Sequence, residues 1–312
     1  MSPRWGIVAT IKAPAEEILR FAAYHLEAGA HRLFIYLDAP NPAAQTALEN
    51  HPKCRVTLCD TAHWQALIGK PPVKHQSRQT LNATHAYGRA GDVDWLAHID
   101  VDEFLVSDRP VADHLADVPA QVETARARPM EMLGGDGTAF KRFIPNGPAR
   151  ERIVNAVYPT FGEYIKGGFL SHLAGKVFVR TGMDGITIRI HNAFRGSDMI
   201  EGTQELSELR LAHAHAKSWK DWQAAYRFRL EKGSYRAELG PAKPRVRGGL
   251  TLNEFFAILE AEEGETGLRA FYDEVCADTP DHRARLAAHD LLHRADLRLS
   301  THLATHFPDW AG

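Results

Sequence analysis

Strand-like and helix-like segments alternate through the first hundred residues, and this alternation limits the fold more than any other feature of the chain. Short apolar runs rich in β-branched residues predict four buried strands, at 6–11, 32–37, 54–59 and 95–99. Apolar residues at helical spacing predict helices between them, at 15–27, 42–49 and 77–90. Such alternation is typical of βαβ units. Because the strands are apolar throughout, we expect a mostly parallel sheet covered on both faces.

The second half of the chain has a different pattern. Residues 133–175 are glycine-rich and are expected to be irregular, and the segment 233–249 is expected to be a flexible basic loop. The sequence predicts two further strands, at 176–180 and 185–190. It also predicts four later helices, at 218–231, 253–262, 267–276 and 281–304. We therefore expect an α/β domain over 1–235 and a helical C-terminal extension over 236–312.

Composition places the chain among ordinary globular proteins. Of its 312 residues, 44% are hydrophobic and 24% are charged, which excludes disordered, collagen-like and coiled-coil proteins. The net charge of −2, without blocks of like charge, predicts no nucleic-acid partner. No apolar run predicts a transmembrane segment or a signal peptide. We expect a cytoplasmic protein with reduced cysteines, with peripheral association at the inner face of the membrane as an option.

The 17 histidines are the one unusual feature of the composition, because histidine is the commonest metal ligand. His213 and His215 are two residues apart, so both rings share one face of an extended segment. His282, His289 and His293 share one face of the predicted helix 281–304. Leucines supply the core of that helix, so we expect these three histidines to lie on a solvated helix face or an interface.

Charged residues follow three of the predicted strands. Lys12 follows the first, Asp38 the second, and Asp100 and Asp102 the fourth. Ligands of open α/β sheets bind outside the carboxyl ends of the strands, where these side chains should gather. The sequence has neither a G-x-G-x-x-G after the first strand nor a phosphate-binding G-x-x-x-x-G-K-[ST]. These absences argue against a dinucleotide dehydrogenase and a P-loop enzyme.

Three carboxylates lie within four residues, at Asp100, Asp102 and Glu103. Carboxylates this close repel one another and need a counter-charge, for which a hard divalent cation such as Mn²⁺ or Mg²⁺ is suitable. In extended chain, the two aspartates point to opposite faces and need not act alike. One can chelate the ion while the other binds a ligand hydroxyl or holds the first in place.

The segment 94–105, which contains this cluster, resembles glycosyltransferases of the GT-A fold. It is most similar to the family 2-like group with the pattern D-W, any three residues, one apolar residue, D-x-D-E-F and Leu or Ile. The resemblance extends over about residues 5–235. It implies a GT-A-like (Rossmann-like) sheet, a nucleotide-sugar donor such as a UDP- or GDP-sugar, and a glycan or lipid-linked acceptor. It further implies dependence on Mn²⁺ or Mg²⁺ and inversion at the sugar.

The resemblance also implies roles for individual residues. Asp102, Asp100 and His213 would bind the metal, and Asp102 would thereby take part in catalysis. The donor would be bound by residues at the strand ends, in the helix 77–90 and near His213, namely Ala9, Thr10, Lys12, Asp38, Arg78, Gln79, Asn82, Asp100 and Lys217. Relatives commonly carry K-N-E and D-N-x-S after the first two strands, whereas this chain has Lys12-Ala-Pro and Asp38-Ala-Pro-Asn.

An inverting transferase needs a general base for the acceptor hydroxyl. We favour Asp136 in the glycine-rich loop 134–137, with Glu131 as the alternative. His215 and His191 remain further candidates for contact with the metal or the diphosphate, and Arg180 for contact with phosphate oxygens.

Two other functions remain open. A nucleotidyltransferase would need a glycine-rich phosphate loop near the N-terminus, which residues 11–14 do not provide. A non-catalytic carbohydrate- or protein-binding module on the same scaffold is consistent with the altered motifs. The three intact carboxylates argue against that module.

Overall fold

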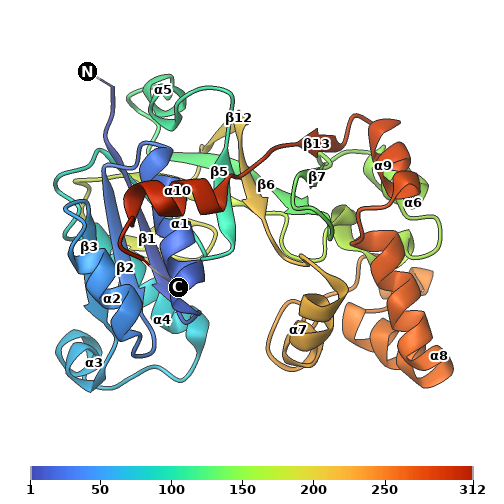
Figure 1. The fold of residues 1–312 in the computed structure, drawn as a ribbon. Helices are drawn as coiled ribbons and strands as arrows, with labels where there is room; N and C mark the ends of the chain where they lie inside the picture. Colours follow the sequence, from blue (N-terminus) through green and yellow to red (C-terminus); the bar gives the residue numbers. More distant parts are fainter. Residues whose placement is uncertain (1, 311–312) are drawn as a thin grey trace. The chain divides into compact units, whose positions relative to one another are not determined.

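The computed structural model describes residues 2–310 and divides into two compact units, which are described separately. Unit 1 comprises Met1–Arg128, Ala174–Leu211 and Leu297–Gly312, and unit 2 comprises Pro129–Leu173 and Ala212–Asp296 (Figure 1). The chain therefore passes from one unit to the other four times. Each of these units is built from separate stretches of the chain. The sequence-based boundary between two domains near residue 235 stays a prediction.

Unit 1 contains a mostly parallel sheet, as predicted. Strands β1 (Trp5–Ile11), β2 (Arg32–Leu37), β3 (Cys54–Leu58) and β4 (Trp95–His98) are parallel, in the order β3-β2-β1-β4. Antiparallel β8 (Lys176–Arg180) follows β4 and pairs in turn with the first half of β6 (Thr124–Met132). Because β1 to β4 are parallel, their carboxyl ends, which the polar residues follow, lie at the same edge of the sheet.

Further strands complete unit 1. β5 (Glu103–Val106) begins immediately after the acidic turn and pairs with β12 (Gln204–His213), which also pairs with β6. A separate small sheet has the order β11-β10-β9 and is formed by β9 (Ile186–Ile188), β10 (Ala193–Arg195) and β11 (Asp198–Met199).

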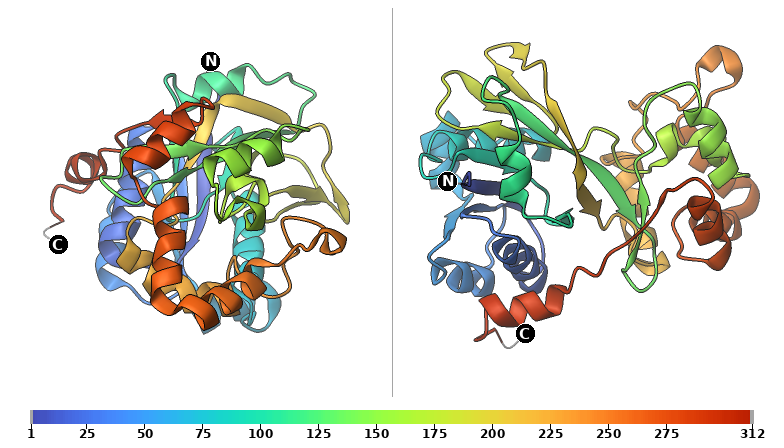
Figure 2. Two further views of the ribbon diagram at one scale, coloured as in Figure 1. Left: turned by 90° about the vertical axis from the view of Figure 1, so that its right-hand side faces the viewer. Right: turned by 90° about the horizontal axis from the view of Figure 1, so that it is seen from above.

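Helices cover both faces of this sheet. Figures 1 and 2 show α1 (Ala15–Glu27), α2 (Pro42–Glu49) and α10 (Leu299–His306) on one face. On the other face, α4 (His75–Tyr87) buries Ala83 and Ala86 against Val8, Phe34 and Leu96 of the sheet. Unit 1 also contains α3 (Thr61–Ile68) and α5 (Val111–Ala116). The predicted α/β class, a mostly parallel sheet flanked by helices, is therefore confirmed.

Helix α10 returns to unit 1 from the far end of the sequence and packs on α1. The His302 ring meets Tyr24 edge-on, with 5.8 Å between ring centroids. His306 Nε2 lies 3.0 Å from the Glu27 carboxylate, and Arg20 donates to Ser300 at 3.4 Å. The outer face of α1 is therefore covered by a segment more than 270 residues away in sequence.

Unit 2 has a helical core around a small antiparallel sheet. The second half of β6 pairs with β7 (Ala139–Arg142), which pairs with β13 (Leu292–Arg294). The helices are α6 (Arg150–Val157), α7 (Trp219–Glu231), α8 (Leu252–Val275) and α9 (Pro280–Ala287), with 3-10 turns η1 (Gly162–Tyr164), η2 (Lys166–Gly168) and η3 (Arg245–Arg247). Their core is rich in aromatic side chains, including Trp222, Phe256 and Phe271, none of which is exposed.

Several predictions for the second half are wrong. The expected helix 281–304 is instead α9, strand β13 and helix α10, so His293 lies on a strand and not on a shared helical face. His282 is fully buried in α9 and does not lie on a solvated face. The two helices expected at 253–262 and 267–276 are joined as α8, with a break at Gly264, where φ is 60°. Residues 133–175 contain β7 and α6 and are not irregular throughout. No helix among the described residues is long and apolar enough to cross a membrane.

Candidate functional site at the strand ends

The strand order of unit 1 contains a switch point. From β1 the chain proceeds to β2 and β3 on one side, and β4 then lies on the other side of β1. In open α/β sheets, ligands bind in the crevice outside the carboxyl ends of the strands at this point. Thr10 lies near the end of β1, and Asp100 lies two residues after the end of β4. Both residues therefore flank the position where a ligand is expected.

Helix α4 sends a polar side chain to each of these strand ends. Gln79 Nε2 donates to Asp100 Oδ1 at 2.6 Å, next to β4. Asn82 Nδ2 donates to Thr10 Oγ1 at 3.1 Å, at the end of β1. Arg78 Nη1 donates to Asp38 Oδ1 at 2.8 Å, after β2. The structure thus connects these six predicted donor-binding residues through one helix.

A buried lysine supplies a counter-charge to the acidic cluster. Lys176 Nζ donates to Asp100 Oδ2 at 2.7 Å and lies 3.3 Å from Glu103 Oε2, with 1% of the lysine side chain exposed. Burial alone would lower the pKa of Lys176, but Asp100 and Glu103 outweigh this effect and raise it. Glu103 Oε2 also accepts from the backbone N–H of Asp100 at 2.9 Å. The ammonium therefore remains charged and fixes the Asp100 carboxylate.

Asp102 is placed differently from Asp100. It lies in the turn between β4 and β5 and is half-buried. The turn is closed by a hydrogen bond from the Glu103 N–H to the Asp100 carbonyl, at 3.0 Å. Because residues 101 and 102 form a turn, the expectation that the two aspartates point to opposite faces of an extended chain stays a prediction.

Asp38 is the second fixed carboxylate of the edge, with 5% of its side chain exposed. Besides the bond from Arg78, its carboxylate lies 3.5 Å from His75 Nδ1. Burial raises the pKa of Asp38, but hydrogen bonds from His75 and Arg78 outweigh burial and lower it. This carboxylate is therefore ionised at neutral pH and available as an acceptor.

The remaining predicted site residues of unit 1 have fewer polar contacts with the strand-end site. Ala9 lies within β1 and has no exposed surface, so its side chain belongs to the sheet core. Lys12 is exposed one residue after β1. Arg180 donates to the carbonyls of residues 118, 119 and 122 and covers Trp95, and His191 Nδ1 lies 3.0 Å from the Gly175 carbonyl. The contacts of Arg180 and His191 are thus with the protein's own backbone and core.

The other predicted site residues belong to unit 2. His213 ends β12, and its ring centroid lies 5.2 Å from that of His215 and 5.8 Å from that of His172. His215 Nε2 lies 3.3 Å from the Tyr235 hydroxyl. Lys217 is exposed. The rings of His213 and His215 therefore lie close together, and the ring of His172 lies beside that of His213, which the sequence did not indicate.

The two candidate bases have different environments. Asp136 is exposed, and its Oδ1 accepts from the Thr138 N–H at 2.9 Å and the Thr138 hydroxyl at 2.6 Å, which lowers its pKa. Glu131 is buried and lies 3.0 Å from Lys141 Nζ. Burial would raise the pKa of Glu131, but Lys141, His215 and Ser171 outweigh it and lower the value far below the usual range. Glu131 therefore forms a buried ion pair with Lys141. Asp136 is the more accessible of the two candidate bases.

Sequence reasoning missed Lys176, His75 and His63, which all contact predicted site residues. His63 Nε2 lies 2.9 Å from Asn82 Oδ1. One signal was available for Lys176, because a lysine at the start of an apolar strand needs a carboxylate partner if it is buried. No comparable pattern marks the two histidines.

The sequence matches no protein-family model and no curated protein. Among solved structures, the chain is similar to HddC from Yersinia pseudotuberculosis, with 8% identity over 72% of this chain and 99% of HddC and a TM-score of 0.37. It is also similar to an active-site mutant of LgtC, with 12% identity over 56% of this chain and a TM-score of 0.28. Another LgtC structure, of a galactosyltransferase with donor and acceptor sugar analogues, matches with 13% identity over 56% of this chain and a TM-score of 0.27.

These matches cover only part of this chain and have low TM-scores. The chain spans 57% of the length of LgtC. Because every one of these TM-scores is below 0.5, the likenesses carry no argument about this chain. The fold and the candidate site therefore rest on the strand order, burial and contacts described above.

Proposed function

We propose that the chain is a glycosyltransferase of the family 2-like group that transfers a sugar from a UDP- or GDP-sugar to a hydroxyl of a glycan or lipid-linked acceptor, with inversion. The observation that carries the proposal is the pair Asp100 and Asp102 at the switch point after β4, with Asp100 fixed by Gln79 and Lys176. The resemblance of residues 94–105 to the D-x-D-E-F pattern supports the same function.

The residues at this edge fit a divalent cation. Carboxylate oxygens are the ligands that Mg²⁺ and Mn²⁺ prefer. We propose that Asp102 and Asp100 hold the ion, with both oxygens of Asp100 oriented by Gln79 and Lys176. Such an ion would stabilise the negative charge that grows on a diphosphate leaving group. We propose His213 as a further ligand.

The chain's own residues have complementary tasks in this proposal. A carboxylate offers about four lone-pair sites, so Asp100 can accept a ribose hydroxyl besides the two bonds it has. Asp38 is ionised and held by Arg78, which suits it to accept from base or ribose. Asn82 has no exposed surface and donates to Thr10, so we propose that it positions Thr10 at the switch point. We propose that Lys12 binds the base or ribose of the donor and that Lys217 meets phosphate oxygens.

Asp136 is our proposal for the general base. Its exposure leaves it open to an acceptor hydroxyl, whereas Glu131 is buried against Lys141. The bonds from Thr138 make Asp136 a weaker base than an isolated aspartate, because they stabilise its ionised form.

The proposal is tested by measuring the melting temperature with a panel of nucleotide sugars, with and without Mn²⁺. A ligand that binds the folded state at 100 times its Kd stabilises the protein by about 2.7 kcal/mol. We expect a UDP- or GDP-sugar to raise the melting temperature in Mn²⁺, and Asp102→Asn to abolish this rise. Asp108→Asn, which removes an exposed aspartate of the same unit, is the matched control and should keep it.

Two outcomes separate the alternatives. If no nucleotide sugar raises the melting temperature with any divalent cation, the transferase proposal is wrong. A donor that binds but is neither hydrolysed nor transferred would instead indicate a non-catalytic binding module. Release of pyrophosphate from a nucleoside triphosphate and a sugar phosphate would indicate a nucleotidyltransferase.

A further inference from the structure

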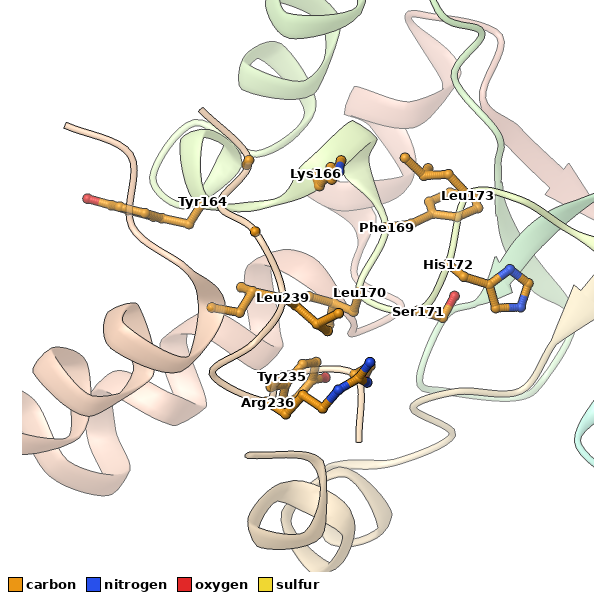
Figure 3. A pocket seen from close by; sticks show the side chains of 14 residues that line it. Tyr164, Lys166, Phe169, Leu170, Ser171, His172, Leu173, Tyr235, Arg236 and Leu239 are labelled. Atoms are coloured by element: carbon orange, nitrogen blue, oxygen red, sulfur yellow. The ribbon is translucent and has the colours of Figure 1, made fainter. Parts of the chain in front are cut away.

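Unit 2 contains a pocket that none of the proposed catalytic residues uses. It has a volume of about 250 Å³ and lies between the segment 164–173 and the segment 234–242, with Leu252 at its side. Figure 3 shows Leu170 and Leu239 close together, with Tyr235 and Arg236 below them and Lys166 above. The sequence had indicated only a flexible basic loop at 233–249, and part of that loop is one wall of this pocket.

The pocket is built on fixed side chains. Tyr235 has no exposed surface, and its hydroxyl accepts from Trp222 Nε1 at 3.2 Å. Asn253 Nδ2 donates to the Tyr235 carbonyl at 3.0 Å, which ties the loop to α8. Lys243, just beyond the lining segment, lies 3.0 Å from Glu163. The loop is therefore anchored on both sides of the lining residues.

Apolar side chains form most of the lining, chiefly those of Phe169, Leu170, Leu173, Leu239 and Leu252. Small-molecule sites are typically apolar cavities with a few polar groups that fix the orientation of the ligand. The apolar lining therefore favours a ligand with a compact alkyl or aromatic body.

The charges in the lining have one sign. Lys166 and Arg236 line the pocket together with His172, and the described lining includes neither an aspartate nor a glutamate. Glu163 pairs with Lys243 and Glu131 pairs with Lys141, whereas Glu238, which is not part of the lining, lies 3.7 Å from Arg236 and offsets part of its charge. Lys166 is exposed and Arg236 is half-buried, and two cations beside apolar walls are complementary to an anionic head attached to an apolar body.

We infer that this pocket binds an amphipathic anion, in which a compact alkyl or aryl body contacts the leucines and a phosphate or carboxylate meets Lys166 or Arg236. In the proposed transferase this ligand would be part of the acceptor, and that role rests on the proposed function. Binding itself requires only unit 2 and is independent of the donor.

The test is isothermal titration calorimetry with four probes, namely hexyl phosphate, hexanoate, hexanol and inorganic phosphate. We expect hexyl phosphate or hexanoate to bind at one site at least tenfold more tightly than hexanol and inorganic phosphate. The tighter of the two identifies the head group, and either supports the inference. The double variant Lys166→Gln/Arg236→Gln should weaken this binding at least tenfold.

Control variants keep the result interpretable. Lys220→Gln removes an exposed cation of α7 outside the pocket and should leave the affinity unchanged. Leu239→Asp places an anion in the partly exposed wall and should abolish binding without unfolding the protein. The inference fails if no probe binds, or if the double variant binds hexyl phosphate and hexanoate as tightly as the natural protein. Because Asp102→Asn should bind these probes normally, failure here leaves the donor-binding result unaffected.

Discussion

Lys176 determines the electrostatics of the strand-end site. Its ammonium is buried between the carboxylates of Asp100 and Glu103, and Glu103 has no exposed surface. A buried charge is tolerated only where partners offset the cost of removing it from water. The three groups therefore depend on one another, and removing the lysine leaves two neighbouring carboxylates without their shared cation.

We therefore predict that Lys176→Met lowers the free energy of unfolding by about 3–5 kcal/mol, the usual cost of breaking a buried ion pair. Chemical denaturation monitored by circular dichroism measures the change. Lys220→Met, on the exposed face of α7, should change the free energy by less than about 0.5 kcal/mol. A loss of less than about 1 kcal/mol in Lys176→Met would show that the ion pair is not needed for the fold.

The acidic residues of the site could be predicted from sequence, whereas their lysine partner could not. Asp38, Asp100 and Asp102 follow apolar strands within one to four residues, so a local pattern places them at the sheet edge. Lys176 is 76 residues away from Asp100 and reaches it only because β8 pairs antiparallel with β4. That pairing is a long-range property, and no local periodicity encodes it.

The residue immediately before strand β8 occupies a backbone position that requires glycine. Gly175 has φ of 68°, and a Cβ at this position would lie 2.1 Å from the Ala127 carbonyl oxygen. Both a left-handed backbone and close approach to β6 therefore exclude a side chain. A side chain at position 175 would therefore displace the next residue, Lys176, whose ammonium binds Asp100.

We predict that Gly175→Ala destabilises the protein by at least about 2 kcal/mol, combining left-handed strain with steric overlap. Gly182→Ala is the matched control, since Gly182 has φ of 79° but no atom within 4 Å of the added Cβ. It should cost only the backbone term, about 1 kcal/mol. Urea denaturation of both variants measures the difference, and equal losses would contradict the role assigned to the close approach.

The elements that sequence predicted well are those with local signals. Helix α2 begins where Pro42 occupies the first turn and Asn41 accepts from the Ala44 N–H. The predicted helix 281–304 failed because β13 forms by pairing with β7, some 150 residues earlier. Asp290 and Arg298 adopt positive φ on either side of β13 and end the helical periodicity there. Leucine spacing alone could not indicate these reversals.

The protein as a whole carries neutral histidines in the interior of both units. Burial lowers the pKa of His25 in unit 1 and of His282 in unit 2 to about 4, in each case against a smaller opposing effect of a backbone carbonyl. The unfolded chain protonates these side chains near their ordinary value of about 6.5. Between these two values the unfolded state binds more protons than the folded state.

The contribution of these two histidines to the free energy of unfolding should therefore be complete above pH 6.5. It should fall as the pH drops towards 4. Each of these histidines contributes a slope of up to about 1.36 kcal/mol per pH unit. His282→Gln should remove one such contribution and flatten the dependence between pH 6.5 and 4. Urea denaturation at pH 7.5, 6 and 5 measures the slope, and an unchanged slope in the variant would contradict the assignment.

The return of α10 to α1 has a consequence for how the protein is made. Residues of α1 leave the ribosome early, but the helix that covers their outer face is synthesised almost 280 residues later. At typical translation rates of about 5–20 residues per second, α1 waits for its partner for tens of seconds. The nascent chain must therefore tolerate an uncovered helix face throughout synthesis. For the same reason, a gene fragment that ends before residue 297 would encode unit 1 without its final covering helix.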